Sequence, residues 1–346
     1  MVLHVFNPEH DLALAANLRN FTAPHAGRQL RADLGYIPAL WAAADDYVLV
    51  ENVEDAEWHF RKLVRRPFGR FVAKEQIGSL DISGVETWGW DLAIRSFLKR
   101  HGVAERLLPS ERQIETIREL SHRRIGWHVL TQLQGEGITG TSEVVESVSL
   151  VREAIERMGR VVVKAPWSSS GRGVRFFENS LKKSDEGWLR NVIACQGGVM
   201  VEPYYNKVKD LGMEFESDGN GRVKYLGLSL FDTSNGAYTG NVLADEEAKE
   251  EILSRYVSVD LLDSVRQNIV SLSGMLFNRK YQGPFGVDMM IVARDDQNGF
   301  MLHPCVEINL RRTMGHVALS LTPYTNGLPK VMSVMCNKDV YKISIK

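Results

Sequence analysis

Residues 283–292, GPFGVDMMIV, and residues 305–311, CVEINLR, decide the architecture that this sequence predicts. Both segments are apolar and are separated by a polar turn, so we expect two neighbouring strands of one hairpin. Successive side chains on a strand point to opposite faces, which places Glu307 and Asn309 on the same face. Asp288 is the one charged residue of the first segment, and it lies across the predicted hairpin from them.

Oxygen ligands dominate this predicted hairpin. A carboxylate in an apolar strand is costly to bury unless a cation or a metal ion neutralises it. Asp288, Glu307 and Asn309 offer two carboxylates and an amide, a set that suits Mg²⁺ bridging phosphate groups. The alternative is an ion-pair cluster, for instance of Asp288 with Arg311, which extends the same face. The oxygen-rich set favours the metal site.

Two earlier segments carry groups that a nucleotide could use. Residues 161–164, VVVK, predict a strand that ends in Lys164 and is followed by a loop of small residues. Glycine and serine let backbone N–H groups approach phosphate oxygens closely. Residues 199–205, VMVEPYY, predict a strand that could offer backbone groups and Glu202 to an adenine edge. Taken singly, the loop is equally consistent with a solvated turn, and a glutamate at a strand end is common.

The glycine loop belongs to neither of the two common phosphate-binding motifs. A P-loop needs GxxxxGK[ST] before a helix, and this string does not occur. A dinucleotide fingerprint needs three spaced glycines between a strand and a helix, and Gly171-Arg172-Gly173 lacks the third. The loop is followed instead by the strand-like residues 174–177.

The remaining chain predicts an ordinary alternation of helices and strands. A small α/β domain is expected over the first third, with strands at residues 2–6 and 47–50. Along the whole chain, the pattern predicts helices at residues 27–34, 91–100, 125–133, 147–158, 246–256 and 259–278. It predicts further strands at residues 144–145, 198–204, 211–217, 223–231, 285–293 and 300–310.

In their order and spacing, the segments VVVKAPWSSSGRGV, VMVEPYY, FGVDMM and VEINLRR resemble the ATP-grasp superfamily over residues 115–320. The resemblance implies two α+β subdomains that clamp ATP, and a preceding α/β domain that helps to form the acceptor site. With the pattern above, it predicts a combined α/β and α+β architecture in four parts: an N-terminal α/β domain at 1–112, a central subdomain at 113–197, a C-terminal subdomain at 198–330, and a tail at 331–346.

The resemblance also implies roles for individual residues. Lys164 would contact the α- and β-phosphates, Glu202 the adenine, and Asp210 the ribose, although many relatives carry Glu at that place. Arg311 would steady the transferred phosphoryl group, so that Arg311 and Lys164 are the implied catalytic residues. A basic residue that precedes the central subdomain would be Arg123 or Arg124. The loop closing over the β- and γ-phosphates would comprise Ser168, Ser169, Ser170, Gly171, Arg172 and Gly173, and the ligands of one or two Mg²⁺ ions would be Asp288, Glu307 and Asn309.

The activity that the resemblance implies is ATP- and Mg²⁺-dependent ligation. A carboxylate would be activated as an acylphosphate and captured by an amine, which forms a carbon–nitrogen bond. Two alternatives stay open: a kinase of the same superfamily that phosphorylates a small molecule, and a non-catalytic nucleotide-binding protein. The resemblance implies a homodimer as one assembly.

Composition limits the partners and the compartment. The chain has 346 residues and 42 basic against 43 acidic side chains, so its net charge of −1 offers no global field for nucleic acid. Three widely spaced cysteines predict neither a disulfide framework nor a structural zinc site, and they fit a reducing compartment. No apolar run reaches the roughly 18–20 residues that span a bilayer. We therefore expect a cytoplasmic protein with small-molecule carboxylate and amine substrates.

Three polar-aromatic clusters in the first third are candidates for the acceptor pocket. They are residues 7–11, NPEHD, residues 22–25, TAPH, and residues 88–91, WGWD. Asn, Asp, Thr and Pro also serve routinely in turns and helix caps. We favour this local role for the clusters.

Overall fold

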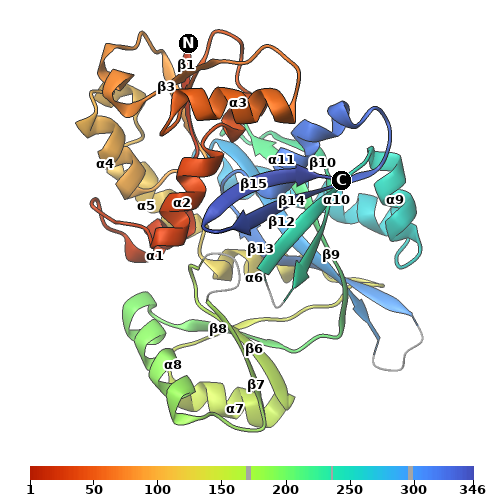
Figure 1. The fold of residues 1–346 in the computed structure, drawn as a ribbon. Helices are drawn as coiled ribbons and strands as arrows, with labels where there is room; N and C mark the ends of the chain where they lie inside the picture. Colours follow the sequence, from red (N-terminus) through yellow and green to blue (C-terminus); the bar gives the residue numbers. More distant parts are fainter. Residues whose placement is uncertain (169–172, 235–236, 295–298) are drawn as a thin grey trace.

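The computed structural model describes all residues except 169–172, 235–236 and 295–298. Figure 1 shows an N-terminal domain in red and orange, a large sheet that runs from cyan to blue, and a smaller green body that projects from them. Three sheets underlie these parts, with four, four and seven strands in the described chain. The mixed α/β and α+β class predicted from the sequence is confirmed.

The N-terminal sheet is parallel and has the strand order β3-β2-β1-β4. Two hydrophobic cores cover its two faces, as expected for a parallel sheet. Its strand order reverses at β1, because β2 and β3 lie on one side of β1 and β4 on the other. The elements are β1 (Val2–Val5), β2 (Tyr47–Leu49), β3 (Arg70–Val72), β4 (Gly84–Thr87), α1 (His10–Ala16), α2 (His25–Leu34), α3 (Val53–Leu63), α4 (Leu92–Arg100), and the short 3₁₀ turns Ile37–Leu40, Lys74–Ser79 and Glu105–Leu107.

The central sheet is antiparallel, in the order β5-β8-β6-β7, and its two helices cover one face. Val161 and Val163 point into the core beneath the helices, so Lys164 points to the opposite face. The elements are β5 (Glu143–Val145), β6 (Arg160–Lys164), β7 (Val174–Glu178), β8 (Val199–Pro203), α7 (Val148–Met158) and α8 (Lys183–Gln196). Ser147 caps α7 through the Leu150 N–H, as the sequence predicted.

The large sheet is antiparallel, in the order β13-β12-β9-β10-β11-β14-β15. Leu211, Met213 and Phe215 alternate along β9 and bury one face against α9 and α10. The elements are β9 (Lys207–Ser217), β10 (Val223–Ser234), β11 (Ala237–Leu243), β12 (Gly283–Ala293), β13 (Phe300–Asn309), β14 (Lys330–Asn337), β15 (Val340–Ile345), α9 (Glu246–Ser254), α10 (Val259–Phe277), α11 (Met314–Leu321) and the 3₁₀ turn Thr322–Thr325.

The opposite face of the large sheet is polar, and glycines make room for its carboxylates. In the strand register, Gly212 lies beside Asp288, and Gly286 lies beside Glu214. A Cβ at Gly286 would lie 2.6 Å from the Glu214 Oε2. A Cβ at Gly315, in α11 above this face, would lie 1.8 Å from the Glu214 Oε1. Side chains at these glycines would therefore displace the carboxylate.

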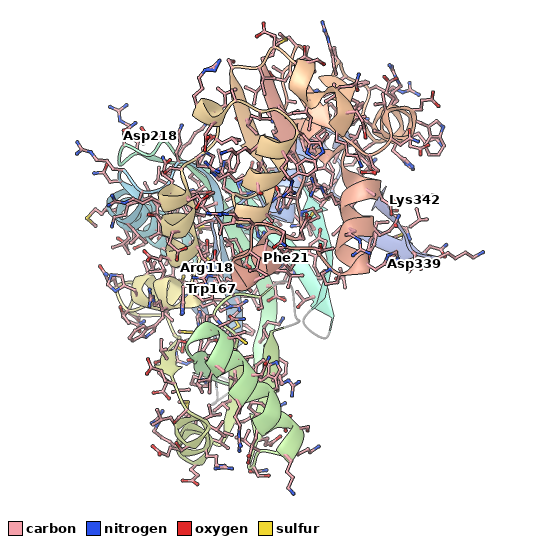
Figure 2. The ribbon with its side chains drawn as sticks, turned by 90° about the vertical axis from the view of Figure 1, so that its left-hand side faces the viewer. Phe21, Arg118, Trp167, Asp218, Asp339 and Lys342 are labelled. Carbon is pink, nitrogen blue, oxygen red and sulfur yellow. The ribbon has the colours of Figure 1, made fainter. Side chains whose placement is uncertain are left out.

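Helices α5 (Glu111–Leu120) and α6 (Arg123–Leu130) belong to the large sheet rather than to the central subdomain in which the predicted boundary at 113 places them. Ile117 and Leu130 pack in the same core as the strands of the large sheet. The central body contacts α5 through Trp167, whose Nε1 donates to the Arg118 carbonyl at 2.9 Å, as the two side chains in Figure 2 illustrate. The apolar stripes of these helices, rather than chain order, decide their partner.

The C-terminal residues form a hairpin and not the predicted tail. β14 pairs with β11, and β15 pairs with β14. The Tyr341 N–H donates to the Asp33 carboxylate of α2 at 2.8 Å, so the hairpin ties the large sheet to the N-terminal domain. Figure 2 labels Asp339 and Lys342 on this hairpin beside the N-terminal helix. Its strands are only partly buried, and their mixed pattern carries little strand signal.

We predict opposite effects for two glycine-to-alanine substitutions in helices. Gly315→Ala places a methyl group against the Glu214 carboxylate and should lower the free energy of unfolding by about 2–3 kcal/mol. Gly187→Ala in α8 meets no atom within 4 Å. It should raise the same quantity by about 0.4–1 kcal/mol, because alanine restricts the unfolded chain. Urea denaturation monitored by circular dichroism measures both, and equal effects would contradict the proposed packing of Gly315.

Candidate active site

The candidate site lies on the polar face of the large sheet, where β12 and β13 meet α6, the central sheet and the N-terminal domain. Asp288 and Glu307 are register partners across these two strands, as predicted. The Asn309 Nδ2 donates to the Asp288 Oδ2 at 3.0 Å. The hairpin therefore brings together the three predicted metal ligands.

Excess negative charge marks this part of the site. The pKa of Asp288 is raised to about 7, chiefly by burial and then by the neighbouring Glu307 and Glu214 carboxylates, against the hydrogen bond from Asn309. Among the described residues, no three His, Cys, Asp or Glu side chains are arranged as a metal-binding group, so the set is limited to two carboxylates and one amide. Such a set fits Mg²⁺, which takes few protein ligands and completes its shell with phosphate and water.

Arg123 is the basic residue that reaches the site. Its guanidinium donates to Glu307 at 2.9 Å, to the Ser168 Oγ at 2.8 Å, and to the Ala165 carbonyl. Its side chain is buried, whereas Arg124 is exposed to solvent. Of the two candidates that the sequence left open, the structure therefore brings Arg123 to the carboxylates.

Lys164 and Glu202 form a buried ion pair on the face of the central sheet that points away from its helices. The Lys164 Nζ lies 2.5 Å from the Glu202 Oε2. The Glu202 side chain could contact adenine, as predicted, only by leaving Lys164. The backbone of β8 could contact adenine without breaking this ion pair. Ser168 contacts Arg123, and Gly173 packs against Ser168, since a Cβ there would lie 2.3 Å from the Ser168 Cβ. Ser169, Ser170, Gly171 and Arg172 lie outside the described residues.

Asp210 lies on the same face of the large sheet as Asp288, one register step away beside Met290. Its carboxylate accepts hydrogen bonds from the Lys207 Nζ at 2.5 Å and from the Thr233 Oγ1 at 2.6 Å. This position at the edge of the site is compatible with the predicted ribose contact.

Arg311 pairs with a residue that the sequence did not assign to the site. Its Nε and Nη2 donate to both oxygens of Asp11, in the N-terminal domain, at 2.8–3.1 Å. Burial would lower the pKa of Arg311, and the Asp11 carboxylate more than offsets this, so the pKa is raised. Burial raises the pKa of Asp11, and the charge and hydrogen bonds of Arg311 outweigh this, so the pKa is lowered. Asp11 is part of the NPEHD cluster, for which the sequence favoured a local role.

Glu214 and His316 form a second buried pair, and neither residue is among the site residues predicted from the sequence. The His316 Nδ1 lies 3.0 Å from the Glu214 Oε2, and each side chain is 3% exposed. His316 also accepts a hydrogen bond from the Thr313 N–H at the start of α11. The alternation Leu211–Phe215 would have revealed Glu214 on the polar face. His316 is thus a buried residue of α11.

His303 is a buried histidine beside the site. It is 1% exposed, and neither ring nitrogen has a hydrogen-bond partner among the described residues. Tyr205 contacts its ring edge-to-face, and Gly140 packs so closely that a Cβ would lie 2.7 Å from the Nε2. The pKa of His303 is lowered to about 3, chiefly by burial and also by the nearby Lys164. The imidazole is therefore held neutral.

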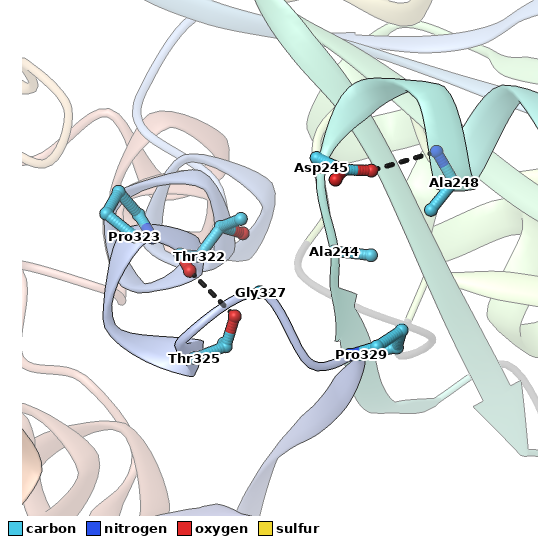
Figure 3. Close-up of a pocket in the computed structure, with 8 residues that line it drawn as sticks. All are labelled: Ala244, Asp245, Ala248, Thr322, Pro323, Thr325, Gly327 and Pro329. Atoms are coloured by element: carbon cyan, nitrogen blue, oxygen red, sulfur yellow. Dashed lines mark hydrogen bonds between the residues drawn. The ribbon is translucent and has the colours of Figure 1, made fainter.

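A separate surface hollow of about 250 Å³ is not the candidate site (Figure 3). The Asp245 carboxylate in its lining caps the Ala248 N–H at 2.9 Å, and the Thr325 hydroxyl donates to the Thr322 carbonyl at 2.9 Å. None of the predicted site residues contributes to its wall. The hollow therefore offers no uncommitted charge for catalysis.

Comparison with known proteins matches this architecture to solved enzymes. No family model and no curated protein match the sequence. N5-carboxyaminoimidazole synthetase from Staphylococcus aureus, complexed with ADP, is 14% identical, with 98% of this chain and 83% of that chain covered and a TM-score of 0.51. Biotin carboxylase from Campylobacter jejuni, in a β,γ-ATP complex, is 12% identical, with 96% and 75% covered and a TM-score of 0.56. The chain has the ATP-grasp fold.

A third structure with the ATP-grasp fold contains a magnesium nucleotide. It is the biotin carboxylase domain dimer of 2-oxoglutarate carboxylase from Hydrogenobacter thermophilus, with MgADP, ADP and bicarbonate. It is 13% identical, with 96% of this chain and 74% of that chain covered and a TM-score of 0.54. In this chain, no helix within the described residues is long and apolar enough to cross a membrane.

We predict that His303 makes folding stability depend on acid pH. Its pKa in the folded protein, about 3, lies below the unfolded value of 6.5. The free energy of unfolding is therefore unaffected by His303 above pH 6.5. As the pH falls from 6.5 toward 3, the unfolded imidazole binds a proton and the folded one does not, so the free energy of unfolding decreases by up to about 1.4 kcal/mol per pH unit. His303→Leu should flatten this part of a urea-denaturation profile and, since it removes unpartnered polar atoms, keep or raise stability at pH 7. Parallel profiles for both proteins would contradict the assignment.

A second prediction separates Arg123 from its neighbour. Arg123→Gln leaves Glu307 without its guanidinium partner and should lower the free energy of unfolding by about 1–3 kcal/mol, a range reduced for the partial exposure of Glu307. Arg124→Gln, on the exposed side of α6, should change it by less than about 0.5 kcal/mol. In the double variant Arg123→Gln/Glu307→Gln part of the loss should return, because the buried charge is gone. Additive losses would contradict a direct pair.

Proposed function

We propose that the protein is a Mg²⁺- and ATP-dependent ligase that activates a carboxylate as an acylphosphate for attack by an amine. The observation that carries the proposal is the electrostatic arrangement of the polar face. Asp288 and Glu307 are neighbouring carboxylates that a divalent cation would neutralise, and Lys164, Arg123 and Arg311 carry charges suited to phosphate groups. A solvated structural surface would not gather these groups at the junction of three sheets.

Each side chain has a task in this proposal. Asp288, Glu307 and the Asn309 oxygen would hold Mg²⁺, which supplies charge neutralisation and orientation of the triphosphate. Lys164 would leave Glu202 for the α- and β-phosphates, and Arg123 would extend its contact with Ser168 toward the same anion. The backbone near Glu202 would hold adenine, and Asp210 would accept hydrogen bonds from the ribose.

The chemistry follows from charge. An acceptor carboxylate that attacks the γ-phosphorus is repelled by the phosphate oxygens, and Lys164, Arg123 and Arg311 relieve this repulsion. The attack forms a carboxylate–phosphorus bond and releases ADP. An amine then adds to the acyl carbon, loses a proton, and expels phosphate to leave an amide. None of these steps requires a nucleophilic side chain of the protein.

The neighbouring structures support the nucleotide part of the proposal. They are a synthetase with ADP, a carboxylase with ATP, and a carboxylase domain with MgADP and bicarbonate. At 12–14% identity these neighbours share the fold with this chain, and their substrates do not transfer to it. One of them is a domain dimer. A homodimer, and a cytoplasmic location, stay predictions for this chain.

Calorimetric titration with ATP, with and without Mg²⁺, tests the site. Wild type should bind ATP more tightly with Mg²⁺, and Asp288→Asn/Glu307→Gln should lose this gain. Glu247→Gln/Glu251→Gln removes the same charge from exposed positions on α9 and should behave as wild type. No ATP binding by wild type would overturn the proposal.

Product analysis separates the ligase from its rivals. With carboxylate and amine pairs, a ligase releases phosphate and forms an amide, whereas a kinase of the same fold leaves a phosphorylated product. A nucleotide-binding protein without catalysis would bind Mg-ATP and turn over neither.

A further inference from the structure

The carboxyl edge of the N-terminal parallel sheet faces the candidate site. The strand order reverses between β1 and β4, and the crevice outside the carboxyl ends at such a reversal is where open α/β sheets bind ligands. The residues that follow these strands are 7–11 and 88–91. The Arg312 N–H donates to the Trp88 carbonyl at 2.9 Å, which joins this edge to the segment after β13. Two of the polar clusters singled out in the sequence therefore meet beside Arg311.

A buried network fixes the first of these clusters. The Asn7 Nδ2 donates to the Gly89 carbonyl at 2.8 Å, and the His10 Nδ1 lies 3.2 Å from the Asp91 Oδ2. Asp91 also caps α4 through the Ile94 N–H at 2.8 Å. A Cβ at Gly89 would lie 2.6 Å from the His10 ring, so this side chain is held from both sides. These contacts hold the start of α1, the helix that carries Asp11, in place.

Asp11, Asn309 and the Arg312 carbonyl together occupy four of the five N–H donors of Arg311. The Nε–H and one Nη2–H go to Asp11, the second Nη2–H goes to the Asn309 Oδ1, and one Nη1–H goes to the Arg312 carbonyl. A guanidinium has five N–H donors, so a single Nη1–H is left. An incoming carboxylate can therefore engage Arg311 by two bonds only if it takes the place of Asp11. The side chains of Arg311 and Asp11 are 14% and 20% exposed, so both keep some contact with solvent.

We propose that the junction between Arg311 and Asp11 takes a zwitterion, an α-amino acid whose carboxylate replaces Asp11 on Arg311 and whose ammonium group binds the released Asp11 carboxylate. The inference rests on the proposed function and names the substrate class of the same site. The carboxylate of the amino acid would pair with Arg311, and its ammonium group would pair with Asp11. Each of the two protein charges therefore keeps a partner of opposite sign. A simple carboxylate would leave Asp11 unpaired in a partly buried place, which is costly.

The segment after β1 argues against a phosphorylated acceptor. Residues 7–11, NPEHD, contain no glycine and add two carboxylates, Glu9 and Asp11. A phosphate site at this position would use glycines whose N–H groups approach the anion. Glu9 is already paired with Arg31 at 2.9 Å, which leaves Asp11 as the carboxylate of this segment that contacts Arg311.

The exchange also gives the reaction a direction. A carboxylate oxygen of the amino acid bound at Arg311 attacks the γ-phosphorus, a new oxygen–phosphorus bond forms, and ADP leaves with the electrons of the broken bond. Asp11 keeps the α-amino group protonated, so this nitrogen has no lone pair with which to attack an acylphosphate. The amine that completes the ligation must therefore come from a second molecule.

The test is calorimetric titration of wild type with each proteinogenic amino acid, both with and without Mg²⁺ and the non-hydrolysable ATP analogue AMP-PNP. At least one amino acid should bind. Its N-acetyl derivative and its decarboxylated amine should each bind at least about tenfold more weakly, because each lacks one charge. These comparisons need no variant, so they hold even if a substitution impairs folding.

Two variants complete the experiment. Asp11→Asn should weaken the amino acid about tenfold or more and narrow its advantage over the N-acetyl derivative. Glu86→Gln is the matched control, since it removes another carboxylate of the N-terminal domain from the adjacent arginine, Arg312, to which it lies at 3.2 Å. It should retain the affinity of wild type for the amino acid.

The outcomes distinguish this inference from the proposed function. If Mg-AMP-PNP binds but no amino acid does under either condition, the substrate class is wrong and the nucleotide site stands. If the N-acetyl derivative binds as well as the free amino acid, Asp11 does not hold an ammonium group, and the inference is overturned. If no nucleotide binds, the ligase proposal fails, whatever the amino acids do.

Discussion

Charge compensation on the polar face of the large sheet is the constraint on which the site depends. Antiparallel pairing places Asp288 beside Glu307, and Glu214 lies one step away on the same face. Their mutual repulsion in a partly buried place would destabilise the sheet without cations. The chain supplies them from elsewhere: Arg123 from α6 and Arg311 from the segment after β13. The raised pKa of Asp288 shows that these two arginines do not fully compensate the negative charge of the site.

The same constraint explains how the parts of the chain are joined. Arg123 contacts both Glu307 of the large sheet and Ser168 of the central body, so one guanidinium spans the junction that a nucleotide would occupy. Arg311 spans the other junction, between the large sheet and Asp11 of the N-terminal domain. The cations that stabilise the protein without nucleotide are thus those that would meet phosphate or carboxylate in a complex. Ligand binding would replace the carboxylate partners of Arg123 and Arg311 by those of the ligand, so neither guanidinium would be left unpaired.

Local signals were strong where strand alternation and motif chemistry agreed. The strands that carry Lys164, Glu202, Asp288 and Glu307 form where the pattern predicts them. Helix α3, helix α8 and the C-terminal hairpin were not predicted, since their apolar residues are fewer and their strands only half buried. Helix α6 was predicted as a helix, but the predicted boundary at 113 assigned it to the wrong neighbour, because an apolar stripe does not specify which sheet it covers.

By itself, the sequence determined the class of fold, the oxygen-rich strand pair and its likeness to ATP-grasp enzymes, because these depend on residues close together in the chain. Only the tertiary structure decided between Arg123 and Arg124, since adjacent helix residues point in different directions and one of them is exposed. It alone joined Arg311 to Asp11, residues 300 positions apart. Such a pair has no local pattern, because it arises from the packing of a parallel sheet edge against a strand of another sheet. The contact of Arg311 with the N-terminal domain is therefore a property of the assembled fold.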